Sequence, residues 1–94
     1  MSKPPEPLPR ELRVDAIRSR LQAAFAPTEL DVIDDSHHHI GHEGARDGRG
    51  HYRVRVVSAA FAGMTPVARH RAVYAALDDL MRTEIHALSI QASA

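Results

Sequence analysis

The sequence predicts one small α+β domain in which a mixed three-stranded sheet is covered on one face by helices. Three observations predict it. Apolar residues recur at helical spacing over residues 10–26, residues 51–57 alternate between apolar and polar side chains, and a second helical stretch precedes a last apolar strand. Ninety-four residues suffice for two layers around a single core. The expected order is therefore helix, strand, strand, helix, strand.

The first predicted helix runs from Arg10 to Ala26, and Pro27 stops it. Residues 1–9 hold four of the six prolines, so they are expected to be a disordered leader. The single domain is then expected to span residues 10–94. The apolar side of the helix is formed by Val14, Ile17, Leu21, Ala24 and Phe25, with Arg13, Arg18, Arg20 and Gln22 between them.

The first two strands are predicted over Glu29 to Asp34 and His51 to Val57, with a long loop rich in His and Gly between them. Because no helix joins them, they are expected to pair antiparallel. Alternation in the second strand sets a core side apart from a polar side. The core side carries Tyr52, Val54 and Val56, and the polar side carries His51, Arg53 and Arg55.

The second helix is predicted to begin with Thr65 as N-cap and Pro66 in its first turn, and to continue to about Arg82. A last strand follows over Ile85 to Ala92, parallel to the previous strand because a helical crossover joins the two. In that strand His86, Leu88 and Ile90 fall on one side. The expected buried stripe of the helix is Val67, Val73, Leu77 and Leu80, flanked by Tyr74 and Met81.

Composition excludes several classes of function. The chain contains no Cys, which rules out disulfides, thiolate catalysis and Cys-type zinc sites built by this chain alone. Its apolar runs are too short for a membrane span and its first residues lack the apolar stretch of a signal peptide, so a cytoplasmic protein without a membrane partner is expected. Neither a nucleophile elbow nor a phosphate-cradling loop is found. We therefore expect no catalytic residues and no enzymatic activity.

The zero net charge conceals blocks of opposite sign. Residues 29–48 are strongly acidic, whereas residues 49–71 contain five Arg and no acid. The basic block is either a positive face for an anionic partner or a set of charges that neighbouring acids neutralise in a hairpin. Both interpretations stay open. The basic block consists of Arg49, Arg53, Arg55, Arg69 and Arg71.

Seven His are the most unusual feature of the composition, and four of them lie in the loop at His37, His38, His39 and His42. Neighbouring side chains of an extended chain diverge, so at most two of these four are expected to bind one metal ion. The alternative is a solvated polar loop. From the residues alone, His86 is interpreted as a core or rim histidine, because it shares a side with apolar residues.

Four short signatures resemble the BolA family and occur in the order found there. They are Asp35-Ser36-x-x-His39, Phe61-x-Gly63, Arg69-His70-Arg71-x-Val73-Tyr74 and Ile85-His86-Ala87-Leu88. The resemblance extends from about residue 10 to residue 92. It implies a class II KH-like α-β-β-α-β fold, in agreement with the mixed sheet predicted above.

The resemblance also implies a function. Members of the family bind a monothiol glutaredoxin and share a 2Fe-2S cluster with it and with glutathione. The cluster is expected only in this complex. The free protein is expected to be a monomer. The resemblance maps the family's ligands to His86 and His39, and because the chain contains no Cys it resembles the His-loop type. The loop from Ser36 to Gly50 is expected to be mobile until a partner orders it.

The runner-up is a DNA-binding transcriptional regulator, which bacterial members of the family are described to be. Its contacts would come from Arg53, Arg55, Arg69 and Arg71. A KH module presents a Gly-x-x-Gly loop to nucleic acid, whereas the turn Gly63-Met64-Thr65-Pro66 lacks the second Gly. KH-style binding through this turn is therefore not expected.

Overall fold

The computed structural model describes residues 8–36 and 50–94. The predicted order of elements is confirmed, with a short 3-10 turn and a third helix added among the described residues. The expected disorder of the leader and mobility of the loop fall almost entirely outside them. The elements are α1 (Arg10–Phe25), β1 (Glu29–Asp34), β2 (Gly50–Val57), η3 (Ala59–Phe61), α2 (Pro66–Ala76), α3 (Asp78–Thr83) and β3 (Ile85–Ser93).

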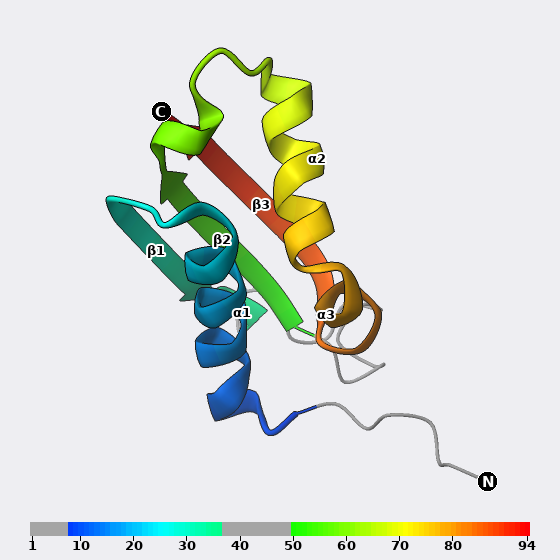
Figure 1. Ribbon diagram of the computed structural model, residues 1–94. Coiled ribbons are helices and arrows are strands. Elements are labelled where there is room, and N and C mark those ends of the chain that lie inside the picture. The colour runs from blue at the N-terminus through cyan, green and yellow to red at the C-terminus, as the bar shows by residue number, and fades with distance from the viewer. Residues whose placement is uncertain (1–7, 37–49) are drawn as a thin grey trace, which may run out of the picture.

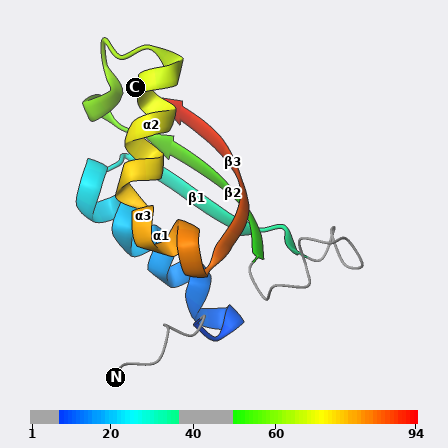
Figure 2. The same cartoon turned by 90° about the vertical axis from the view of Figure 1, so that its right-hand side faces the viewer.

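The sheet has the order β1-β2-β3, so β2 is the central strand. β1 pairs antiparallel with β2, and β2 pairs parallel with β3, as the sequence predicted. Figures 1 and 2 show that α1, α2 and α3 lie on the same side of the sheet. The α+β fold with helices on one face is confirmed, and no helix or strand of the described residues covers the opposite face of the three strands.

The core lies between the sheet and the helices. Alternation in β2 predicted its inner face correctly, because Tyr52, Val54 and Val56 are buried. Ser58 follows β2 and holds the next turn, since its hydroxyl donates to the Phe25 carbonyl at 2.6 Å. The other buried apolar side chains are Ile17, Leu21, Val32, Phe61, Val73, Leu77, Leu80 and Ile85.

The first helix departs from its predicted pattern at three positions. It ends at Phe25, and Ala26 adopts a left-handed conformation with φ of 43° before Pro27. Ala24, predicted on the apolar side, is exposed, whereas Arg13, predicted on the polar side, is buried. The side of α1 that faces the domain is therefore less apolar than the spacing indicated.

The second predicted helix is two helices. The capping prediction is confirmed, because the Thr65 hydroxyl accepts the Ala68 N–H at 3.1 Å. The chain then leaves helical geometry at Leu77, with φ of −102° and ψ of 11°, which separates α2 from α3. The Met81 N–H still donates to the Leu77 carbonyl, so α3 follows α2 directly. Because the apolar spacing runs on through Leu77, the sequence pattern did not reveal the break between the two helices.

The predicted buried stripe of α2 is also wrong in part. Val67 is 59% exposed and Tyr74 is 42% exposed. The helix instead packs on the core through Val73 and the small side chains Ala72 and Ala76. Close packing through alanines turns Val67 and Tyr74 away from the sheet. Within residues 8–36 and 50–94, no helix is long and apolar enough to span a membrane.

Candidate functional site

His86 lies in a β-bulge at the start of β3. The register pairs Gly50 with Ile85 and His51 with Ala87, so His86 is one residue extra on β3. Ile85 is fully buried on one side of this bulge, whereas His86 is exposed. The prediction that His86 shares a buried side with Leu88 and Ile90 is therefore wrong, because the bulge breaks the alternation between them.

A second imidazole lies beside His86. The ring centres of His51 and His86 are 5.3 Å apart, and their planes are inclined by 52°. His51 is half-buried and sits at the start of β2, next to the bulge. Sequence reasoning placed His51 on the polar side of its strand but gave it no role, because the register between β2 and β3 is not visible in either strand alone.

The end of β1 is fastened to the start of β2 at this same place. The Ser36 N–H donates to Asp34 Oδ1 at 2.9 Å, and the His51 N–H donates to Ser36 Oγ at 3.0 Å. The Asp35 N–H donates to the His51 carbonyl at 2.8 Å. Ser36 and Gly50, the described residues that flank the segment 37–49, thus both lie next to His51. His39, the other predicted ligand, lies in that segment and outside the described residues.

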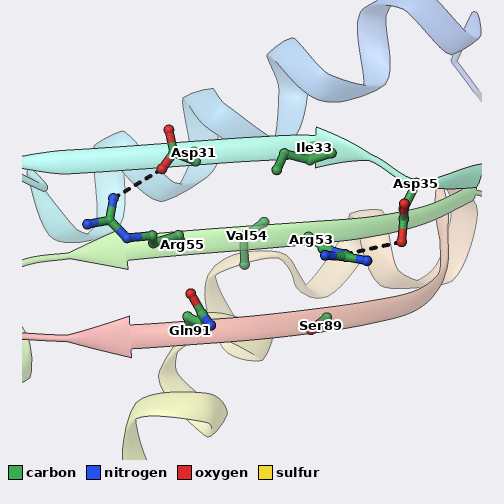
Figure 3. A pocket seen from close by; sticks show the side chains of 8 residues that line it. All are labelled: Asp31, Ile33, Asp35, Arg53, Val54, Arg55, Ser89 and Gln91. Carbon is green, nitrogen blue, oxygen red and sulfur yellow. Dashed lines mark hydrogen bonds and ion pairs between the residues drawn. The ribbon is translucent and has the colours of Figure 1, made fainter.

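The Arg side chains of β2 point to the open face of the sheet, where acids neutralise them (Figure 3). Arg53 Nε lies 3.2 Å from Asp35 Oδ2. Arg55 lies 3.1 Å from Asp31 and 3.3 Å from Glu29, and these carboxylates raise its pKa, chiefly through the hydrogen bond to Asp31. The interpretation that the two charge blocks pair in a hairpin is confirmed for these two Arg.

A shallow pocket on this face is lined by Asp31, Ile33, Asp35, Arg53, Val54, Arg55, Ser89 and Gln91.

The remaining two predicted nucleic-acid contacts lie elsewhere. Arg69 donates to the Phe61 carbonyl at 3.2 Å and to the Ala92 carbonyl at 3.3 Å, so it joins α2 to the backbone of two other elements. Arg71 is exposed on α2, one of the helices that cover one face of the sheet (Figure 2). Arg53 and Arg55 lie on the other face (Figure 3). The structure therefore does not gather the four Arg into one surface.

Sequence reasoning also missed a buried ion pair close to His86. Arg13 of α1 lies 3.2 Å from the carboxylate of Glu84, two residues before His86. No local signal reveals it, because the partners are far apart in the chain. Within the described part of the chain, no three His, Asp or Glu side chains are grouped as a metal site. The His51 and His86 pair is the candidate site that the described residues offer.

Comparison with known proteins gives the family. The family model for the BolA-like protein matches residues 21–94. Protein BOLA1 of Arabidopsis thaliana is 42% identical over 83 residues, which cover 85% of this chain and 52% of the relative. The DNA-binding transcriptional regulator BolA of Vibrio cholerae is 43% identical over 76 residues, which cover 81% of this chain and 69% of that protein.

Solved structures agree with the sequence comparison. BolA1 from Arabidopsis thaliana superposes with a TM-score of 0.74 at 38% identity, covering 86% of this chain and 89% of the other. The BolA domain of SufE1 from the same plant gives 0.76 at 41% identity, with 86% and 90% covered. The chain spans only 22% of the SufE-like protein 1 sequence and about half of BOLA1. With this match in sequence and in fold, the chain belongs to the BolA-like family.

Proposed function

We propose that the protein is a non-enzymatic adaptor that binds a monothiol glutaredoxin and holds a 2Fe-2S cluster jointly with it and with glutathione. The observation that carries the proposal is the exposure of His86 on its bulge. An exposed imidazole at the end of a sheet is accessible to a partner protein, whereas a core histidine is not. Membership of the BolA-like family supports the same function.

The chemistry of the donors fits this role. Each iron of a 2Fe-2S cluster takes two ligands from outside the cluster, and two imidazoles replace two thiolates on one iron in Rieske centres. The glutaredoxin and glutathione supply thiolates, and a chain without Cys supplies imidazoles. We propose His86 and His39 for these positions. Imidazole ligands lower the negative charge of the cluster and raise its reduction potential.

Chain length supports the inclusion of His39. His39 lies three positions after Ser36 in the chain, a span of at most about 10 Å. Ser36 Oγ accepts the N–H of His51, whose ring lies beside that of His86. We propose that His39 reaches the iron beside His86 from this anchored starting point. His37, His38 and His42 lie close in sequence, so each of them is able to substitute for it.

Reconstitution tests the proposal. The purified chain is mixed with a monothiol glutaredoxin, glutathione, iron and sulfide, and we expect a coloured heterodimer whose visible circular dichroism differs from that of the glutaredoxin homodimer. His86→Ala should abolish the heterodimer spectrum without unfolding the free protein, and His39→Ala should weaken it less. His70→Ala, which removes an exposed histidine of α2, is the matched control and should behave as the wild type. The proposal fails if the wild-type chain gives only the homodimer spectrum.

DNA binding is the second candidate function, and similarity to the DNA-binding transcriptional regulator BolA of Vibrio cholerae is what favours it. The dispersion of the four Arg weighs against it, since Arg53 and Arg55 are paired with acids and Arg69 binds backbone carbonyls. A mobility-shift titration of DNA with the purified protein tests this second function. Binding through phosphate contacts must weaken steeply with salt, by a log–log slope of about −0.9 per neutralised phosphate. Absence of binding at micromolar protein and low salt would exclude this function.

A further inference from the structure

We propose that His51 and His86 of the free protein form a two-imidazole site for a divalent transition-metal ion such as Zn²⁺. The site requires neither a glutaredoxin nor a cluster, so it goes beyond the proposed function and does not depend on it. Its basis is the position of two histidines on neighbouring strands, which the bulge at His86 brings side by side.

The separation of the rings fits a shared ion. A Zn–N bond is about 2.1 Å long, and the ring centre lies about 1.1 Å beyond the nitrogen, so two imidazoles on one tetrahedral zinc ion have their centres about 5.2 Å apart. The ring centres of His51 and His86 are 5.3 Å apart. Each imidazole has two nitrogens, and either of them can bind a metal ion.

The backbone that carries the two rings is firmly held. Tyr52, next to His51, is 2% exposed, and Ile85, next to His86, is fully buried. Between them, the Gly50 N–H donates to the Glu84 carbonyl at 2.9 Å and fixes the start of β2 against the start of β3. The bulge is therefore anchored on both strands by buried neighbours. A site held in this way loses little conformational freedom when it binds an ion.

The donor set defines the class of ion. Neutral imidazole suits Zn²⁺, Cu²⁺ and Ni²⁺, whereas Mg²⁺ and Ca²⁺ require oxygen ligands. Two protein ligands leave the remaining positions of a four-coordinate ion to water or to a ligand from outside, as in open zinc sites. Affinity should follow the general order of these metals, with Cu²⁺ bound more tightly than Zn²⁺.

The experiment must separate this pair from the histidines of the loop. A variant in which His37, His38, His39 and His42 are all replaced by Ala retains only His51, His70 and His86. Zn²⁺ is titrated into this variant while the imidazole nitrogen resonances are followed by NMR and binding is measured by calorimetry. His70 is the internal control, because it lies on α2 and away from the starts of β2 and β3 that carry His51 and His86. Mg²⁺ serves as the control ion.

We expect one Zn²⁺ per chain, with the resonances of His51 and His86 shifting together and those of His70 unchanged. His51→Gln and His86→Gln should each weaken Zn²⁺ binding at least about tenfold. Loss of a residue that only hydrogen-bonds a metal ligand already lowers metal affinity by about that factor, and loss of the ligand itself should lower it no less. The double variant should weaken it little further, as expected for one shared ion. Packed aromatic rings lie at similar separations, and a contact of that kind would give no binding. No Zn²⁺ binding, or binding in which only one of the two rings shifts, overturns the inference while leaving the glutaredoxin reconstitution unaffected.

Discussion

The guanidinium of Arg13 lies 3.2 Å from the carboxylate of Glu84, and the two side chains are only 10% and 3% exposed. The same carboxylate accepts the Leu8 N–H at 2.7 Å, and Arg13 donates to the Leu8 carbonyl at 3.1 Å. The backbone carbonyl of Glu84 accepts the Gly50 N–H. This cluster joins the start of α1 to the starts of β2 and β3, immediately before the bulge that carries His86.

Removal of either partner of the Arg13–Glu84 pair should lower the free energy of unfolding substantially. Glu84→Ala leaves the Arg13 charge buried without its carboxylate, and we expect a loss of about 3–5 kcal/mol in the free energy of unfolding. Urea denaturation measures it. The double variant Arg13→Met with Glu84→Leu should lose less than the two single variants combined, because it leaves no charge behind. Glu29→Ala, which breaks an exposed pair with Arg55, is the control. A loss in Glu84→Ala no larger than in this control would contradict the prediction.

Gly50 is expected to tolerate no side chain. A Cβ atom at this position would lie 2.7 Å from Ser36 Oγ and 2.7 Å from both Cε2 and the hydroxyl of Tyr52. Tyr52 is buried, so it has little room to move, and Gly50→Ala should lower the free energy of unfolding by about 1–3 kcal/mol through overpacking.

Gly63→Ala is the matched control for Gly50→Ala. At Gly63 no atom of the described residues, apart from Gly63 and its two chain neighbours, lies within 4 Å of an added Cβ, and the cost comes from its φ of 77°. Only the Gly50 variant should shift the NMR resonances of His51 and His86. Unchanged His resonances in Gly50→Ala would show that the start of β2 absorbs the added methyl group.

Replacement of Arg69 and replacement of Arg71, both on α2, should have different effects on the free energy of unfolding. Arg69 donates to two backbone carbonyls, from Phe61 and Ala92, and Arg69→Ala should cost about 1–3 kcal/mol because it leaves both acceptors without this donor. Arg71 is exposed, and Arg71→Ala should change the free energy of unfolding by less than about 0.5 kcal/mol. Thermal unfolding of the two variants, measured side by side, checks this. Equal stability of both variants would mean that Arg69 does not hold α2 against β3.

The sequence predicted what local patterns determine. Periodicity and turn residues gave the order of elements, the bounds of β1 and the inner face of β2, because each depends on a few neighbouring residues. The bulge at His86 depends on the register of two strands, and the burial of Arg13 depends on Glu84, 71 residues away. Such non-local contacts have no signature within a sequence window. The resemblance to a family indicated His86 as a ligand, whereas His51 required the structure.

The pair Arg20 and Asp79 connects α1 with α3 and gives a prediction about pH. Arg20 donates two hydrogen bonds to the Asp79 carboxylate, one of them at 2.8 Å. These bonds lower the pKa of Asp79 below its ordinary value. We expect Arg20→Ala to raise the pKa of Asp79 toward that value, as measured by an NMR titration of its carboxyl carbon. Arg82→Ala, which breaks the neighbouring pair with Asp78, is the control and should leave Asp79 unchanged.

The sign of the effect on stability follows from linkage. A carboxyl group whose pKa is lower in the folded state contributes stability above its unfolded pKa of about 3.9, and this contribution is lost as the pH falls through the folded pKa. The difference in unfolding free energy between the wild type and Arg20→Ala should therefore be constant from about pH 5 upward and should vanish at lower pH. It should also be small and shrink with added salt, because both side chains are about half exposed. A difference that grows on acidification would show that the two helices are not joined by this ion pair.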